Sequence, residues 1–180
     1  MTTANKLTLL RMALIPVFLG VLYAGLPRGL ALGIFIVASL TDTLDGYIAR
    51  HYNQITDFGK FMDPLADKVL VMAAMCWFVE AGRRPGCVLA VVLLREFAVS
   101  GMRLVAVEQG RVIAAAWSGK VKTAATMVCL CLMLLTEAMG LMGSLPTMVD
   151  LASNSVIVVT TLYSGVEYFI KNRDVFKNAK

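Results

Sequence analysis

The sequence predicts an all-α membrane protein with six transmembrane helices, because of its composition and its apolar runs. Of its 180 residues, 58% are apolar and 16% are charged, and the mean hydropathy is +0.74. Soluble domains average about 45–50% apolar and about 25% charged residues. The length fits six spans of about 20 residues joined by short connections. These figures disfavour a soluble enzyme and exclude a disordered or low-complexity chain.

Six apolar runs, separated by glycine, proline and clusters of charge, mark the expected spans. The runs lack the strict alternation of a membrane β-strand, so helices are expected throughout. The first run is longer than the apolar region of a signal peptide, about 7–15 residues, so we expect it to be retained. No linker or internal repeat divides the chain, which predicts one integral-membrane domain over residues 1–180. The expected spans are about Leu7–Leu26, Gly29–His51, Lys60–Ala81, Cys87–Glu108, Trp117–Met142 and Met148–Ile170.

The lysine and arginine residues of the connections predict the orientation. If the N-terminus lies in the cytoplasm, eleven Lys and Arg residues lie on the inner side, the inner ends of the spans included, and three lie outside. The remaining three, Lys68, Arg95 and Arg103, are counted as within spans. Cytoplasmic loops are enriched in both residue types, so both termini are predicted to be cytoplasmic, in the cell (inner or plasma) membrane. The end of the second span and the start of the third then face the cytoplasm. Trp77 and Trp117 are expected to anchor the chain at the membrane interface.

The net charge of +5 follows from the same enrichment in lysine and arginine. The sequence contains no basic stripe with interleaved aromatic residues, so nucleic acid is not expected as a partner. The basic tail at Lys171–Lys180 is instead expected to lie against anionic membrane lipid.

Four aspartates gather where the second span ends and the third begins. Asp42 and Asp45 are three residues apart, and Asp63 and Asp67 are four apart, so each pair shares one helical face. A short connection makes the two helices antiparallel neighbours. Charges at a membrane are costly and need a physical cause. We therefore expect the four carboxylates to meet at the cytoplasmic membrane boundary.

Such a cluster predicts a divalent metal ion. Four adjacent carboxylates repel one another, and without a cation some of them would be neutralised. Mg²⁺ or Mn²⁺ suits an all-carboxylate site, and the cluster holds no His or Cys that would favour zinc. Gly46 and Ala49 leave room for a ligand, and Arg50 supplies a planar fork for phosphate oxygens. Metal, arginine and carboxylate together favour phosphoryl-type transfer.

The four aspartates are also compatible with two roles that involve no transfer reaction. They could be solvated charges at a membrane edge, or they could form the pathway of a small cation transporter. Solvation at the membrane edge would explain a single acid near a helix end. It explains less well four aspartates that recur at helical spacing. A proton or cation relay needs acids through the depth of the membrane, whereas these are bunched at one side.

The whole segment from Asp42 to Asp67 reads D-x2-D-G-x2-A-R-x8-G-x3-D-x3-D. With all eight fixed positions and their spacings present, it resembles the signature of the CDP-alcohol phosphotransferase family. The resemblance implies transfer of a phosphatidyl group from CDP-diacylglycerol to an alcohol, with release of CMP, in phospholipid biosynthesis. It also implies six spans with both ends inside and a homodimer.

The resemblance also implies a role for each matching residue. Asp42, Asp45 and Asp63 are expected to bind the metal. Asp67 is expected to be the general base, in contact with the metal, and to take the proton of the acceptor hydroxyl. The residues implied to contact CDP-diacylglycerol are Gly46, Ala49, Arg50 and Gly59 of the signature, and Asn5, Thr8 and Arg11 near the start of the chain.

The sequence also contains the Arg95-Glu96 pair with Arg103, and the motifs Asn5-x2-Thr8-x2-Arg11, Asp63-Pro64-x-Ala66-Asp67-Lys68 and Trp117-x-Gly119-Lys120-Val121-Lys122-Thr123. By these it is, within the family, most similar to bacterial members whose acceptor is sn-glycerol 3-phosphate. This acceptor is an anion and needs cations. Arg95 and Arg103 are eight residues apart, within about 80° on one helical face. Lys120 begins the fifth helix from the cytoplasmic side. These three are expected to bind the acceptor phosphate, with Glu96 orienting Arg95. For Lys122, a site role and the positive-inside bias account for the residue equally well. The alternative acceptors are inositol phosphate and serine.

Overall fold

The computed structural model describes residues 3–51, 57–111, 113–114 and 116–177, with side chains described for 8–41, 62, 65–66, 68–111, 113–114 and 116–175. This part of the chain is all-helical, and the six predicted helices are confirmed. A four-residue helix, α7, lies in the segment predicted as a basic tail. The helices are α1 (Thr3–Tyr23), α2 (Arg28–His51), α3 (Asp57–Glu80), α4 (Gly86–Glu108), α5 (Trp117–Ala138), α6 (Ser144–Lys171) and α7 (Asp174–Lys177).

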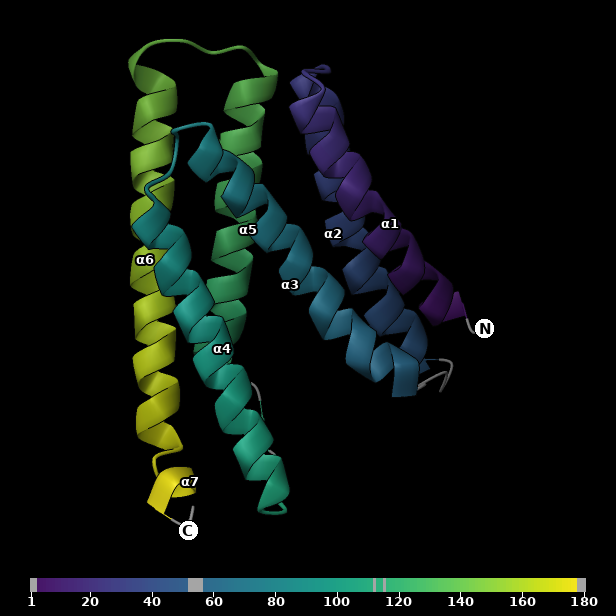
Figure 1. Ribbon diagram of the computed structural model, residues 1–180, viewed down its shortest axis with the longest axis vertical. Coiled ribbons are helices and arrows are strands. Elements are labelled where there is room, and N and C mark those ends of the chain that lie inside the picture. The colour runs from purple at the N-terminus through teal and green to yellow at the C-terminus, as the bar shows by residue number, and fades with distance from the viewer. Residues whose placement is uncertain (1–2, 52–56, 112, 115, 178–180) are drawn as a thin grey trace.

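The helices run back and forth along one bundle (Figure 1). The principal packing pairs are α1 with α2 and α3, α5 with α6 and α2, and α4 with α6. The turns after α1, α3 and α5 lie toward the top of Figure 1. The start of α1, the end of α2 and the end of α6 lie toward its lower half. The end of α2 and the start of α3 therefore share one end of the bundle with the start of α1 and the end of α6. The cytoplasmic location of this end stays a prediction.

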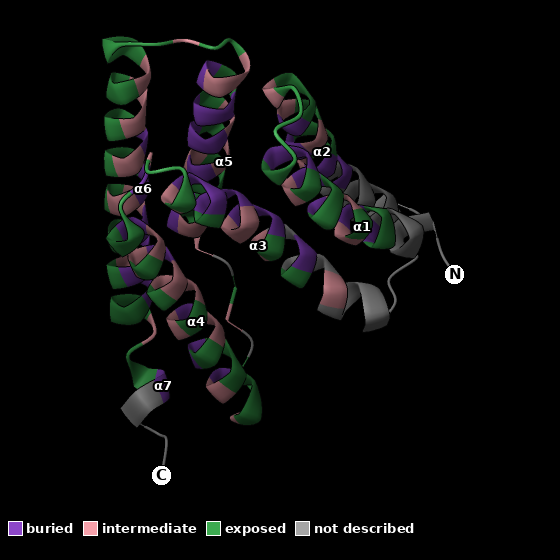
Figure 2. Ribbon diagram, turned by 45° about the horizontal axis from the view of Figure 1, so that its top comes forward, coloured by how far each residue is buried: buried purple, intermediate pink, exposed green. Residues whose placement is uncertain are grey.

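The outer surface fits a membrane protein. Among the described residues, α5 and α6 are long and apolar enough to cross a membrane, and α1 and α2 contain shorter apolar stretches, Thr8–Tyr23 and Arg28–Thr41. Large apolar side chains face outward, with Leu94, Phe97 and Leu151 each more than 70% exposed. Figure 2 shows α6 exposed over much of its surface, whereas much of α5 is buried. An apolar surface of this extent is expected to contact lipid.

Several helix boundaries differ from the sequence prediction by a few residues, including the start of α1 at Thr3 and its end at Tyr23. The differences at α5 and α6 have local reasons. Helix α5 ends before the expected Met142, because Gly140 adopts a φ of +61° and the N–H of Leu141 turns back to the carbonyl of Thr136 at 3.2 Å. Helix α6 begins at Ser144, before the expected Met148. Pro146 then lies in the first turn, where its missing N–H would have had no helical partner.

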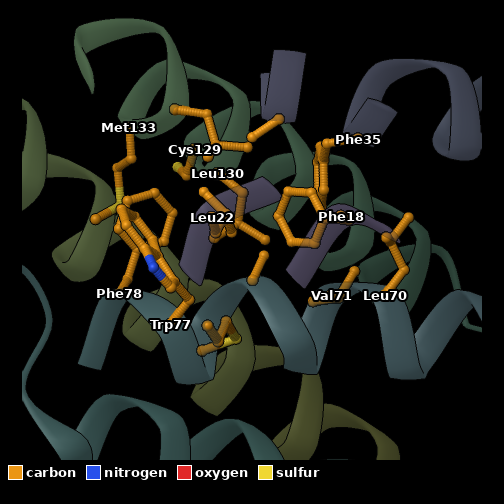
Figure 3. Close-up of a cluster of buried hydrophobic side chains, with 14 of the residues drawn as sticks. Phe18, Leu22, Phe35, Leu70, Val71, Trp77, Phe78, Cys129, Leu130 and Met133 are labelled. Atoms are coloured by element: carbon orange, nitrogen blue, oxygen red, sulfur yellow. The ribbon is translucent and has the colours of Figure 1, made fainter. Parts of the chain in front are cut away.

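The main apolar core lies chiefly between α1, α2, α3 and α5 (Figure 3). Phe18 and Phe35 are fully buried, with ring centroids 5.7 Å apart. The expectation that Trp77 anchors the chain at the membrane interface is wrong. Trp77 is only 6% exposed, its ring packs against Phe78, and the Arg28 guanidinium lies 5.1 Å from the ring centroid.

Arg83, in the turn between α3 and α4, connects that turn to α5 and α6. Its guanidinium donates to both carboxylate oxygens of Asp150, at 2.6 and 2.8 Å, and to the Thr136 hydroxyl at 2.8 Å. The Glu137 carboxylate lies 3.4 Å away. The Arg83 and Asp150 side chains are 15% and 14% exposed, so the pair is largely shielded from water. This cluster ties together the end of the bundle opposite to the aspartate signature.

Asp150→Ala is expected to destabilise the protein by about 3 kcal/mol, because it leaves a largely buried guanidinium without its bidentate partner. The unfolding midpoint in detergent should fall, while the substrate affinities stay unchanged. Ser155→Ala on the same helix is the matched control, since its exposed hydroxyl bonds only to the carbonyl of Leu151. An unchanged midpoint for Asp150→Ala would show that the pair contributes nothing to stability.

Candidate functional site

A cavity of about 760 Å³ lies among α2, α3, α4, α5 and α6. The described side chains of its lining include four basic groups and one carboxylate, and their formal charges sum to four minus one, or +3. A cavity of this sign and size can hold a small polyanion. The charged residues that the structure describes in this lining are Lys68 of α3, Arg95, Glu96 and Arg103 of α4, and Lys120 of α5.

Arg95 is held on two sides. Its Nη1 donates to Glu96 Oε1 at 3.0 Å, and its Nη2 donates to the Ser164 hydroxyl of α6 at 2.6 Å. The Arg95 side chain is only 13% exposed. The expected contact between Glu96 and Arg95 is therefore present, and a second partner comes from a helix that sequence reasoning did not connect to the site.

Glu96 is the centre of a group of cations. Lys122 Nζ donates to its Oε1 at 2.7 Å, and Lys68 Nζ lies 3.7 Å from its Oε2. Lys68 also donates to the Ser100 hydroxyl at 2.9 Å. Lys122 is 4% exposed, so its role is a buried ion pair with Glu96, which the sequence did not predict. The pair compensates a carboxylate that would be costly to bury alone.

Arg103 and Lys120 carry charges that no described carboxylate neutralises within ion-pair distance. Arg103 Nε donates to the Tyr168 hydroxyl at 3.1 Å, and its guanidinium lies 5.6 Å from the Tyr168 ring centroid. A purely structural pairing of Arg103 with a neighbouring acid finds no support among the described side chains. Lys120 is exposed at the first turn of α5 and faces the same cavity. Within the described part of the chain, no carboxylate competes with an anionic ligand for either cation.

The signature aspartates lie on the expected helices. Asp42 and Asp45 fall within α2, Asp63 and Asp67 fall within α3, and the two helices contact each other. Their side chains, with those of the other signature positions and Asn5, lie outside the described residues, so the metal cluster stays a prediction. The described side chains alone contain no group of three or more potential metal ligands.

The cavity reaches the helix segments that carry the signature. Ser39 lines it from α2, three residues before Asp42, and Lys68 lines it from α3, directly after Asp67. The three predicted acceptor residues line the same cavity.

The two described residues predicted to border the nucleotide lie inside the bundle. Thr8 and Arg11 of α1 are 1% and 0% exposed, on a helix that packs against α2 and α3. Water does not reach the charge of an arginine that is buried in such a bundle, so the residue is expected to have a structural or functional role. Their contact with a nucleotide stays a prediction.

Ser164 and Tyr168 were missed by sequence reasoning. They are four residues apart, so they share one face of α6 and lie one turn apart. This pair of polar side chains within an apolar span is the signal that could have found them. The signal is weak, because such residues also serve as contacts between membrane helices.

Comparison with known proteins decides the family. A family model described as CDP-alcohol phosphatidyltransferase matches residues 1–164, which is most of the chain. The chain belongs to this family. It is 42% identical over 189 aligned positions to the CDP-diacylglycerol–glycerol-3-phosphate 3-phosphatidyltransferase of Bacillus subtilis (strain 168), with 97% of each chain covered. Proteins of the same name are 40% identical in Shigella flexneri serotype 5b (90% of each chain) and 35% identical in Rickettsia bellii (92% of each).

The match to the CDP-alcohol phosphatidyltransferase family includes both parts of the candidate site. It contains the eight signature positions between Asp42 and Asp67, and it contains Arg95, Arg103 and Lys120. It ends at Ser164, so Tyr168 lies beyond the matched region. The resemblance that the signature indicated is confirmed over the whole length from α1 into α6.

Proposed function

We propose that this protein transfers the phosphatidyl group of CDP-diacylglycerol to sn-glycerol 3-phosphate, giving phosphatidylglycerophosphate and CMP. The names of its relatives and its family membership support the reaction. The observation that carries the choice of a phosphorylated acceptor is the cavity beside the signature helices, whose described charged side chains sum to +3.

The acceptor phosphate is proposed to bind Arg95, Arg103 and Lys120. Guanidinium groups match phosphate oxygens with paired donors, and an ammonium adds a point charge. Serine as acceptor would leave both arginines without a phosphate to bind. Inositol phosphate carries a phosphate too, so the cavity alone does not favour one phosphorylated acceptor over the other, and the names of the relatives favour glycerol 3-phosphate.

In the proposed reaction, the acceptor hydroxyl oxygen attacks the phosphorus on the lipid side of the diphosphate. The new P–O bond forms as the bond to CMP breaks, and Asp67 takes the hydroxyl proton. Arg50 contacts the diphosphate, and the small residues Gly46 and Gly59 let the nucleotide approach the backbone. Arg95 holds the acceptor so that its hydroxyl stays near the phosphorus.

The donor set fits a hard divalent ion, because the signature offers carboxylates at Asp42, Asp45, Asp63 and Asp67 without histidine or cysteine. We propose Mg²⁺ or Mn²⁺. When bound, the ion neutralises charge on the diphosphate and on departing CMP.

We further propose that all six long helices span the cell membrane, with both termini and the site facing the cytoplasm. The count of eleven inner against three outer Lys and Arg residues supports this orientation. CDP-diacylglycerol then enters from the bilayer and glycerol 3-phosphate enters from the cytoplasm. A homodimer is proposed on the family resemblance alone.

Purified protein in lipid nanodiscs, given CDP-diacylglycerol, Mn²⁺ and labelled glycerol 3-phosphate, is expected to form labelled lipid and CMP in equal amounts. Chelation of the metal should stop both products, and added Mg²⁺ or Mn²⁺ should restore them. Unlabelled serine should not compete with glycerol 3-phosphate. A folded preparation that forms neither product overturns the proposed function, and cation flux without CMP release would favour a cation transporter.

A further inference from the structure

One turn of α6 contacts both arginines of the cavity. Ser164 is fully buried and accepts a hydrogen bond from Arg95 Nη2 at 2.6 Å. Tyr168, which is 1% exposed, accepts one from Arg103 Nε at 3.1 Å. Neither hydroxyl carries a charge, so this turn orients the arginines without neutralising them.

Two glycines make room for the Arg95 side chain. A Cβ atom added at Gly165 of α6 would lie 3.2 Å from Arg95 Cγ, and one added at Gly119 of α5 would lie 3.4 Å from Arg95 Nη2. The distance at Gly165 is tight, so an alanine there would move the stem of the arginine by a few tenths of an ångström, whereas the distance at Gly119 is close to ordinary van der Waals contact. The Arg95 side chain therefore lies against the backbones of two neighbouring helices, which limits its rotamers.

Limiting the rotamers of an arginine has a consequence for binding. A free arginine side chain loses conformational entropy when a ligand fixes it. A side chain that is already fixed binds phosphate without that cost. In this chain, Glu96 and Ser164 fix the guanidinium of Arg95 at one end, and Gly165 borders its stem.

We propose that Ser164, Gly165 and Tyr168, the arginine-positioning turn of α6, set the affinity of the enzyme for the phosphate of its acceptor. This inference rests on the proposed function and deepens it. The three residues are positioning residues, because they act through Arg95 and Arg103. If the turn served only helix packing, substitutions in it would lower the stability of the protein and would change the KM values for both substrates alike.

Ser164→Ala and Gly165→Ala are each expected to raise KM for glycerol 3-phosphate about tenfold. The first variant removes a hydrogen bond to the charged Arg95 side chain, and the second displaces that side chain. Tyr168→Phe keeps the ring beneath Arg103 but removes the hydroxyl, and it should raise KM for glycerol 3-phosphate about threefold. KM for CDP-diacylglycerol and the unfolding midpoint should stay near the wild-type values. Gly33→Ala on α2 is the matched control, because a Cβ there meets nothing within 4 Å.

A double-mutant cycle separates positioning from packing. In an Arg95→Lys background, Ser164→Ala is expected to change KM for glycerol 3-phosphate less than about twofold, because the guanidinium that Ser164 orients is already absent. Equal tenfold effects in both backgrounds overturn the inference, as does a parallel rise of both KM values. If Gly165→Ala does not fold, Ser164→Ala carries the test. Turnover of the wild-type protein tests the proposed function separately.

Discussion

Asp67→Asn is expected to lower kcat by about 10²–10⁴-fold, the usual contribution of a positioned general base. Asparagine has the size of aspartate but does not accept the proton of the acceptor hydroxyl at neutral pH. Binding of CDP-diacylglycerol should stay largely intact, because the other signature residues are unchanged. Single-turnover kinetics and nucleotide binding, measured on the same nanodisc preparation, separate the two effects.

The control for this variant is Glu108→Gln, which removes an exposed carboxylate at the end of α4. It should leave kcat and both KM values unchanged. An Asp67→Asn protein that turns over at the wild-type rate would remove Asp67 from the mechanism. Loss of nucleotide binding together with activity would instead assign it a binding role.

Arg95→Gln is expected to raise KM for glycerol 3-phosphate by about 100-fold or more. Removing one partner of a desolvated, hydrogen-bonded charge pair costs about 2–5 kcal/mol, and glutamine offers neither the charge nor the fork. KM for CDP-diacylglycerol should change little, since the nucleotide residues lie on α1, α2 and α3. Initial rates with each substrate varied in turn give the two constants.

Arg111→Gln is the matched control for this change, because Arg111 is exposed and lies outside the lining of the 760 Å³ cavity. Its kinetic constants should equal those of the wild type. An Arg95→Gln protein with an unchanged KM for glycerol 3-phosphate would place the acceptor phosphate elsewhere.

The helices were predictable because their signals are local. Apolar runs broken by glycine and proline gave six spans, and the errors at the ends arose from backbone details such as the φ of +61° at Gly140. Arg95 and Arg103 could be placed on one side because a helix repeats its faces regularly. The structure brings both to one cavity with Lys120, as that spacing indicated.

The contacts between distant helices were not predictable. Lys122 and Glu96 are 26 residues apart, and no local rule says that one will be buried against the other. Ser164 and Arg95 are 69 residues apart and meet only because α4 packs against α6. Which side of an apolar span faces protein and which faces lipid depends on tertiary packing, and the burial of Trp77 shows the same dependence.

Diffraction at the manganese edge from crystals grown with Mn²⁺ and a CDP-lipid tests the central claim most directly. We predict an anomalous peak between the end of α2 and the start of α3, bonded to carboxylate oxygens of Asp42, Asp45 and Asp63 and to the diphosphate. The phosphorus on the lipid side should then face the cavity that Arg95 lines. Nucleotide bound at these helix ends with no manganese beside it, or with the aspartates turned to separate environments, would contradict the account.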